Sequence, residues 1–224
     1  MSKSSSSIIS KIIIAVSGLV LVLFILGHTA GNLLIYLGQD AMNSYADALK
    51  SNPPLLWGTR IAVFVSVILH VIFSVKVTAM NRKAKPTMYA KKGYETSTLQ
   101  SRSMMLLGIT IFLFLIYHLA HFTGGVTNPD HYAMHELSGR HDVYGMMIAG
   151  FKMPFISLIY IIAATTLGLH ISHAIQSMAH TLGINGNIFS SCAKNVSRIV
   201  GFLVALGLGS IPIMVLLGVI GGNS

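Results

Sequence analysis

The chain has 224 residues, of which 53% are hydrophobic and only 9% are charged. Soluble globular domains carry about 25% charged residues, so this composition excludes a water-soluble protein and indicates one that lies in lipid. The net charge of +9 does not indicate nucleic-acid binding, because the basic residues are distributed as in a membrane protein. The single cysteine, Cys192, excludes a disulfide framework and an iron–sulfur cluster, which needs about four thiolates.

Five apolar stretches are long enough to cross a hydrocarbon core about 30 Å thick, which takes about 20 helical residues. They lie near residues 11–37, 56–80, 103–123, 153–179 and 197–220. The first has no small-residue cleavage pattern before Asn32, so we expect a retained helix and not a removed signal peptide. The sequence therefore predicts an all-α fold, in which residues 1–224 form a single integral membrane domain of five transmembrane helices.

The connections between these stretches differ in composition. Residues 38–40 are typical of a turn, and Asn43 to Lys50 of a short interfacial helix that ends before residues 52–54, since proline disfavours helical geometry in the residue before it. The connection 81–102 is basic and is expected to form a docking or lipid-facing surface. The connection 124–153 contains Gly and Pro turn signals.

Charge placement predicts the topology. The side shared by the N-terminus and the second and fourth connections carries most of the basic residues: Lys3, Lys11, Lys76, Arg82, Lys83, Lys85, Lys91, Lys92, Arg102, Lys194 and Arg198. The opposite side carries Lys50, Arg60, Arg140 and Lys152, with five of the six acidic residues. The positive-inside rule therefore puts the N-terminus in the cytoplasm and the C-terminus, after five crossings, outside.

Six of the ten histidines lie in or at the end of the predicted spans: His28, His70, His118, His121, His170 and His173. A polar ring inside lipid is costly, so each is a functional candidate. Counting about 1.5 Å per residue puts His28 and His118 at ~26 and ~22 Å from the inner face, and His70 and His170 at ~12 and ~6 Å. This count predicts an outer pair, His28 with His118, and an inner pair, His70 with His170, roughly 15 Å apart.

Two imidazoles from facing helices at matched depth are what bis-histidine ligation of a haem requires. With one cysteine there is no C-x-x-C-H attachment motif, so the haems would be non-covalent haems b. The glycines Gly27, Gly31 and Gly168 are expected to leave room for a macrocycle. The other interpretation is that these histidines form interhelical hydrogen bonds or a proton path.

Two further histidines leave the choice of ligand open. His121 and His173 each follow a proposed ligand by three residues and so lie on nearly the same helix face. They are expected to make a haem-propionate contact, an interhelical hydrogen bond or a quinone contact. His131, His135 and His141 cluster in the outer connection, but their spacings of four and six residues are a weak signal for zinc.

Several short segments, in order, carry a resemblance to a known family: residues 28–33 (HTAGNL), 43–46 (NSYA), 69–70 (LH), 81–86 (NRKAKP), 101–104 (SRSM), 118–123 (HLAHFT), 167–173 (LGLHISH) and 181–183 (TLG). From about residue 12 to 190 the chain resembles the large cytochrome b subunit of dihaem succinate dehydrogenases and fumarate reductases. The resemblance implies five helices, with His28 and His118 as axial ligands of the outer haem b and His70 and His170 as those of the inner one.

The resemblance also implies partners. These are a flavoprotein that handles succinate and fumarate, an iron–sulfur subunit docked on the cytoplasmic face over Arg82 to Arg102 and His180 to Arg198, and a quinone, expected to be menaquinone. The chain would be the non-flavin membrane subunit, which does not itself oxidise succinate, in the cytoplasmic (inner) membrane of a bacterium. Some dihaem relatives carry a glutamate two residues before the fourth-helix ligand, linked to a compensating proton path, and here that residue is Gly168.

Two other functions are weighed against this one. The first is the dihaem cytochrome b subunit of another quinone-linked enzyme, such as a hydrogenase or formate dehydrogenase, which only the partner protein would distinguish. The second is a cofactor-free transporter or membrane scaffold. All six acidic residues lie in the predicted connections, so the mid-membrane carboxylates that often mark a transporter's substrate site are missing.

Overall fold

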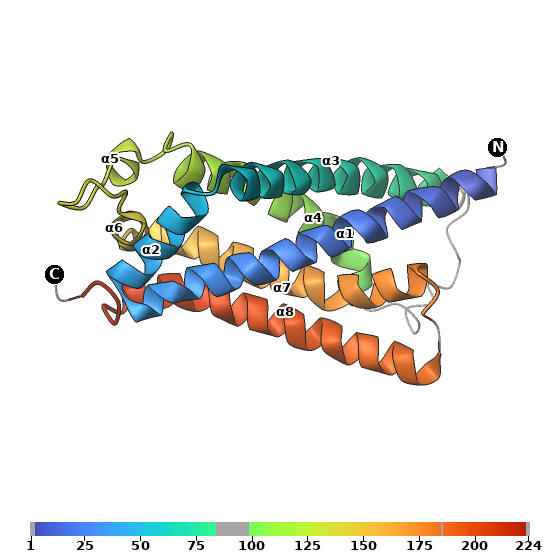
Figure 1. The fold of residues 1–224 in the computed structure, drawn as a ribbon. Coiled ribbons are helices and arrows are strands. Elements are labelled where there is room, and N and C mark those ends of the chain that lie inside the picture. Colours follow the sequence, from blue (N-terminus) through green and yellow to red (C-terminus); the bar gives the residue numbers. More distant parts are fainter. Residues whose placement is uncertain (1–2, 84–98, 185, 223–224) are drawn as a thin grey trace.

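The chain forms a bundle of long helices in the computed structural model, which describes residues 3–83, 99–184 and 186–222 (Figure 1). The helices long and apolar enough to cross a membrane number five within these residues. They are α1 (Lys3–Leu33), α3 (Pro53–Lys83), α4 (Leu99–His118), α7 (Pro154–Thr181) and α8 (Asn187–Leu216). The predicted all-α fold with five candidate membrane spans is thereby confirmed.

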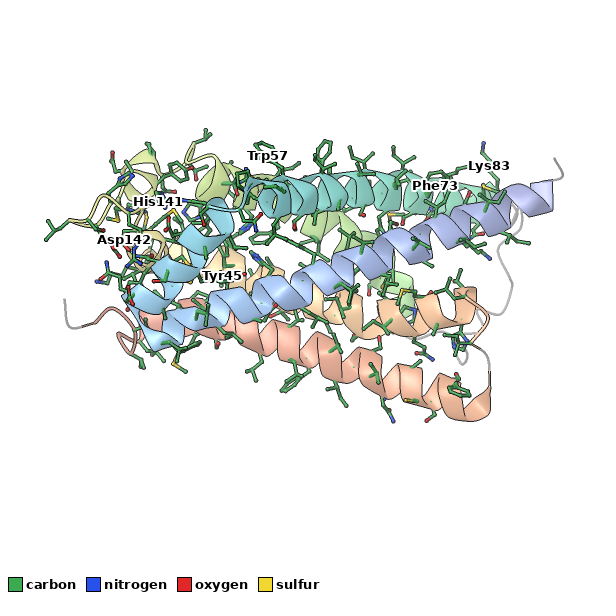
Figure 2. All side chains as sticks on the ribbon, viewed as in Figure 1. Tyr45, Trp57, Phe73, Lys83, His141 and Asp142 are labelled. Carbon is green, nitrogen blue, oxygen red and sulfur yellow. The ribbon has the colours of Figure 1, made fainter. Side chains whose placement is uncertain are left out.

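The short elements gather at one end of the bundle. These are α2 (Gln39–Lys50), α5 (Pro129–Tyr132) and α6 (Val143–Phe151), and the C-terminal end of α8 lies with them (Figure 1). The start of α1, the end of α3 and the α7–α8 connection lie at the opposite end. Trp57 and Lys83 mark the two ends of α3 (Figure 2). We call the end that carries α2 and α6 the α6 end; which end faces the cytoplasm stays a prediction.

The predicted boundaries around α2 are partly wrong. Gly38 adopts a φ of 96°, and α2 then starts at Gln39 and not at Asn43. An acidic residue, Asp40, suits this first turn, because the helix dipole favours negative charge there. Pro53 begins α3 instead of standing before it, since proline lacks only an N–H that the first helical turn leaves unbonded in any case.

The fifth helix also differs from its prediction. It was expected at 197–220, but α8 runs from Asn187 to Leu216. Hydropathy misses the polar first turns of this helix, and Gly218, with a φ of 70°, supplies the left-handed residue that commonly ends a helix. Helix α6 was not predicted at all, although most of its residues are buried.

The tightest packing joins α7 to α8. A Cβ at Gly168 would lie 2.5 Å from the carbonyl oxygen of Gly201 and 2.6 Å from the Cβ of Ala205. Ser197 Oγ donates a hydrogen bond of 2.8 Å to the carbonyl of Ile171 across the same seam. Small residues thus bring the two backbones together, as is common between membrane helices.

Burial is concentrated at the α6 end. A hydrophobic cluster there joins the end of α1, α2, α6, α7 and α8, and it consists of Ile35, Met42, Met147, Ile148, Phe151, Ile156, Tyr160, Ile211, Val215 and Ile220. By contrast, α3 has one buried residue, Ser66, and none of the side chains described in α4 is buried. The apolar faces of α3 and α4 would therefore contact membrane lipid.

Candidate functional site

The inner histidine pair joins α3 to α7. The ring centroids of His70 and His170 lie 6.4 Å apart, with the ring planes at 72°. His70 Nδ1 lies 3.2 Å from the carbonyl oxygen of Ile14 and 3.4 Å from Ser17 Oγ, both in α1. His170 Nδ1 is buried and has no hydrogen-bond partner among the described residues.

The outer histidine pair joins α1 to α4. The ring centroids of His28 and His118 lie 5.8 Å apart, with the ring planes at 87°. His118 Nδ1 lies 3.3 Å from the hydroxyl of Tyr160 in α7, and His28 Nε2 lies 3.3 Å from the amide nitrogen of Asn32. The rings that the depth count paired are therefore neighbours in the fold, while their role as axial ligands stays a prediction.

Both centroid distances suit an iron between the rings. A metal–imidazole nitrogen bond is about 2 Å long and each nitrogen lies about 1.1 Å from its ring centre, so two rings on one iron have centroids roughly 6 Å apart. The observed values are 5.8 and 6.4 Å. The centroid separations of both pairs therefore agree with this value.

Hydrogen bonds at one ring nitrogen determine which nitrogen could bind a metal. A metal-bound histidine usually donates its other N–H to a carbonyl, carboxylate or water, which fixes the tautomer. Because Nδ1 of His70 contacts Ile14 and Nδ1 of His118 contacts Tyr160, Nε2 is the nitrogen of each ring that could bind a metal. In His28 the contact is at Nε2, so ligation through that atom requires the Asn32 amide to turn aside.

Only one of the three glycines expected to leave room for a macrocycle faces open space. Two other glycines lie against the inner pair. A Cβ at Gly27 would meet nothing within 4 Å. A Cβ at Gly31 would lie 2.6 Å from the Tyr45 ring, and Gly168 faces α8, so the room expected at these two positions is used for helix packing. Instead, a Cβ at Gly18 would lie 3.3 Å from His70 Cε1, and one at Gly108 would lie 3.8 Å from His170 Cε1.

Under the haem ligation that the sequence predicts for this pair, replacing Gly18 with valine is expected to displace the His70 ring and to remove most of the inner haem signal from the reduced spectrum. The reason is that the added carbons would enter space now within van der Waals contact of the imidazole. Gly58→Val, also in a spanning helix, is the control, because a Cβ there meets nothing within 4 Å. Equal haem content in the two variants would contradict this role of Gly18.

His121 is placed differently from His118. It lies in the π-helical segment Leu119–Thr123 that continues α4, and it is 2% exposed. Its Nδ1 lies 2.9 Å from the Tyr160 hydroxyl, its ring stacks on Phe122, and its Nε2 is buried without a partner among the described residues. The expected interhelical hydrogen bond is therefore present, whereas neither His121 nor His173 is in ring contact with a histidine of α1 or α3.

A groove lies beside the outer pair, between α4 and α7. Its volume is about 310 Å³, and it is lined by Thr110, Leu113, Phe114, Tyr117, Ile159, Ile162 and Ala163. Phe114 contacts both His118 and Tyr160, with ring centroids 5.7 and 5.0 Å apart. The groove is therefore connected to the outer pair through Phe114, which lines it and contacts His118.

Two other predictions fall elsewhere in the chain. The rings of His135 and His141 lie 5.5 Å apart, yet within residues 3–83, 99–184 and 186–222 no group of three or more His, Cys, Asp or Glu side chains could hold a metal ion. Most of the basic connection proposed as a dock, residues 84–98, lies outside the described residues.

Comparisons of the chain with protein-family models, with curated proteins and with solved structures found no match. The role of the histidine pairs must therefore be inferred from their own geometry and from the sequence.

Proposed function

We propose that this chain is the cytochrome b membrane-anchor subunit of a succinate:quinone oxidoreductase, that is, of a succinate dehydrogenase or fumarate reductase. Two haems b would carry electrons between a cytoplasmic iron–sulfur subunit and membrane quinone. The observation that carries the proposal is the presence of two histidine pairs, with centroids 5.8 and 6.4 Å apart, supplied by four different helices. The order of family-like segments in the sequence supports this enzyme over other quinone-linked dihaem proteins, and the partner protein would distinguish them.

The donor type and the ring separations of the two pairs support two bis-histidine haems. Each haem, when bound, would act as a one-electron carrier. His28 and His118 would hold the outer one and His70 and His170 the inner one, each through a neutral ring nitrogen. The Ile14 carbonyl and the Tyr160 hydroxyl orient His70 and His118. Among the described residues the buried Nδ1 of His170 has no hydrogen-bond partner, so this atom is open to a bound group.

The proposed arrangement in the membrane follows from the charges. The end with the start of α1 would face the cytoplasm of a bacterium, where a flavoprotein and an iron–sulfur subunit would dock on it. Electrons would pass from the inner pair to the outer pair. The apolar groove between α4 and α7 would let a quinone, expected to be menaquinone, approach the outer pair from the bilayer.

A haem count with a partner test decides between this function and its alternatives. The complex purified through this chain is expected to contain two non-covalent protohaems per chain in a pyridine haemochrome assay, with succinate reducing both. The expectation follows from the two pairs and the single cysteine. Absence of haem would favour a transporter or scaffold. Haem reduced by hydrogen or formate, but not by succinate, would assign the chain to another quinone-linked enzyme.

A further inference from the structure

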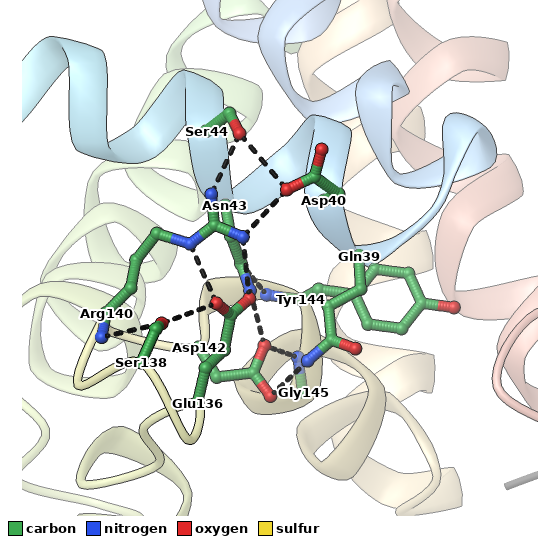
Figure 3. Close-up of polar contacts among 10 residues, drawn as sticks. All are labelled: Gln39, Asp40, Asn43, Ser44, Glu136, Ser138, Arg140, Asp142, Tyr144 and Gly145. Carbon is green, nitrogen blue, oxygen red and sulfur yellow. Dashed lines mark hydrogen bonds and ion pairs between the residues drawn. The ribbon is translucent and has the colours of Figure 1, made fainter.

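A polar network ties α2 to the connection before α6 (Figure 3). Arg140 makes two hydrogen bonds to the Glu136 carboxylate, of 2.8 and 2.9 Å, and a third of 2.9 Å to Asp40. Hydrogen bonds from Arg140 and from Asn43 lower the pKa of Glu136 to about 2. The carboxylate is therefore ionised throughout the physiological pH range, and the network is held by charge-assisted hydrogen bonds.

Asn43 is the centre of this network. Its side chain is fully buried, at 0% exposure. Its amide nitrogen donates to Glu136 Oε1 at 2.6 Å and to Asp142 Oδ1 at 2.8 Å, and its amide oxygen accepts from the Tyr144 N–H at 2.9 Å. Both amide hydrogens and the oxygen are thus in use, and each bond leads to the segment that begins α6.

The network determines where α6 starts. Asp142 is the N-cap of α6 and accepts a hydrogen bond of 2.8 Å from the Gly145 N–H. The same Oδ1 atom accepts from Asn43, and Gln39 of α2 donates to the other carboxylate oxygen at 3.0 Å. Helix α6 is therefore held at its first turn by α2. Helix α2 in turn follows α1, which carries the ligand candidate His28.

The far end of α6 packs on the outer site. A Cβ at Gly150 would lie 3.3 Å from His121 Cε1. The Phe151 ring lies 5.0 Å from that of Tyr160 and 5.6 Å from that of Phe122, and Tyr160 contacts His118. Met147, between the two ends of α6, is 4% exposed. Helix α6 thus packs on His121, Phe122 and Tyr160, and the last two contact His118 of the outer pair.

We propose that Asn43 is a positioning residue that holds α6 as a seal over the outer histidine pair and so keeps water away from the outer haem. The part concerning haem rests on the proposed function, whereas the seal itself does not. Water stabilises the charged ferric state of a bis-imidazole haem more than the neutral ferrous state, so opening the seal lowers the midpoint potential of the outer haem. The inner pair lies farther from the α6 end, so opening the seal leaves the midpoint potential of the inner haem unchanged.

The decisive variant is Asn43→Asp. It keeps the shape of the side chain but replaces the two N–H donors by a carboxylate that faces Glu136 and Asp142. The change therefore removes both donors and adds like-charge repulsion between the new carboxylate and its two neighbours. Asn43→Ala, which removes the donors without adding charge, is the milder second variant. Asn128→Ala, in the connection that carries Glu136 and Arg140 but outside the network, is the control.

The first measurement follows α6 directly and does not depend on haem. The purified complex, carrying Met147→Cys in a Cys192→Ser background, is treated with a hydrophilic maleimide in detergent. Labelling of the introduced thiol is expected to accelerate at least tenfold with Asn43→Asp and to a smaller extent with Asn43→Ala, and to stay unchanged with Asn128→Ala. Unchanged labelling in both Asn43 variants would overturn the seal.

The second measurement is a redox titration of the same complexes without the thiol substitutions. Asn43→Asp is expected to shift the reduced-to-oxidised ratio of the outer haem about tenfold at fixed potential, or about 59 mV for one electron, and to leave the inner haem unchanged. Equal shifts of both haems would mean general loosening of the bundle and would overturn the positioning role. A complex without haem but with accelerated labelling would refute the proposed function and keep the seal.

Discussion

Alanine at His70 or His170 is expected to remove the inner haem alone, and alanine at His28 or His118 the outer haem alone. In each case half of the haem would be lost, because one imidazole cannot provide both axial ligands. The rings are neighbours in these two combinations, with centroids 6.4 and 5.8 Å apart. The measurement is a pyridine haemochrome count, with a redox titration that resolves the two spectral components.

Controls make this test specific. His121→Ala and His173→Ala are expected to retain both haems, because neither ring is in contact with the histidine of a facing helix. His135→Ala, in the outer connection, controls for the substitution itself. Loss of the same component in His28→Ala and His70→Ala would refute the pairing. Loss of the outer haem in His121→Ala, but not in His118→Ala, would exchange the ligand on α4.

Alanine at Gly168 is expected to destabilise the bundle strongly. The added methyl group would lie 2.5 Å from the Gly201 carbonyl oxygen and 2.6 Å from the Ala205 Cβ, and a backbone atom cannot move aside as a side chain can. Overpacking by a methylene group costs about 1–3 kcal/mol, and this site should lie at the upper end of that range or beyond it. The measurement is the thermal unfolding midpoint of the purified complex in detergent.

Gly209→Ala is the matched control for this substitution. It places the same methyl group on α8, where the nearest atom, the Ala164 Cβ, would be 3.7 Å away, which is ordinary van der Waals contact. We expect its unfolding midpoint to stay close to that of the unmodified chain. A Gly168→Ala complex as stable as the Gly209→Ala complex would mean that α7 and α8 are not held together at this seam.

The features predicted correctly are those that depend on one helix at a time. Hydropathy identifies a helix long and apolar enough to span a membrane without knowledge of its neighbours. The constant rise per residue predicts which histidines lie at the same height along the bundle, as His28 does with His118 and His70 with His170. The polar first turns of α8 were missed because they lie outside the apolar stretch. The buried helix α6 was missed because it is too short to span a membrane.

Features that depend on contacts between distant segments could not be predicted. Asn43 and Glu136 are 93 residues apart in the chain, and nothing in either local sequence indicates the other. Which face of Gly168 is crowded depends on the position of α8, so the expectation of room for a macrocycle there was wrong. His118 and His121 share a helix face, and only the positions of α1 and α6 distinguish their surroundings.

The close packing of α7 on α8 at Gly168 also limits which side chains can be introduced at this position. A glutamate at this position, two residues before His170, would need space that the backbone of α8 now fills, so a carboxylate could be gained here only together with a displacement of α8. Under the proposed function, electrons would cross the bilayer in the present chain with no acidic group on α7 to carry a compensating proton. The membrane voltage would act on the reaction directly, at about 2.3 kcal/mol per charge for each 100 mV, and the proton-motive force of the cell would favour one direction of succinate–quinone chemistry over the other.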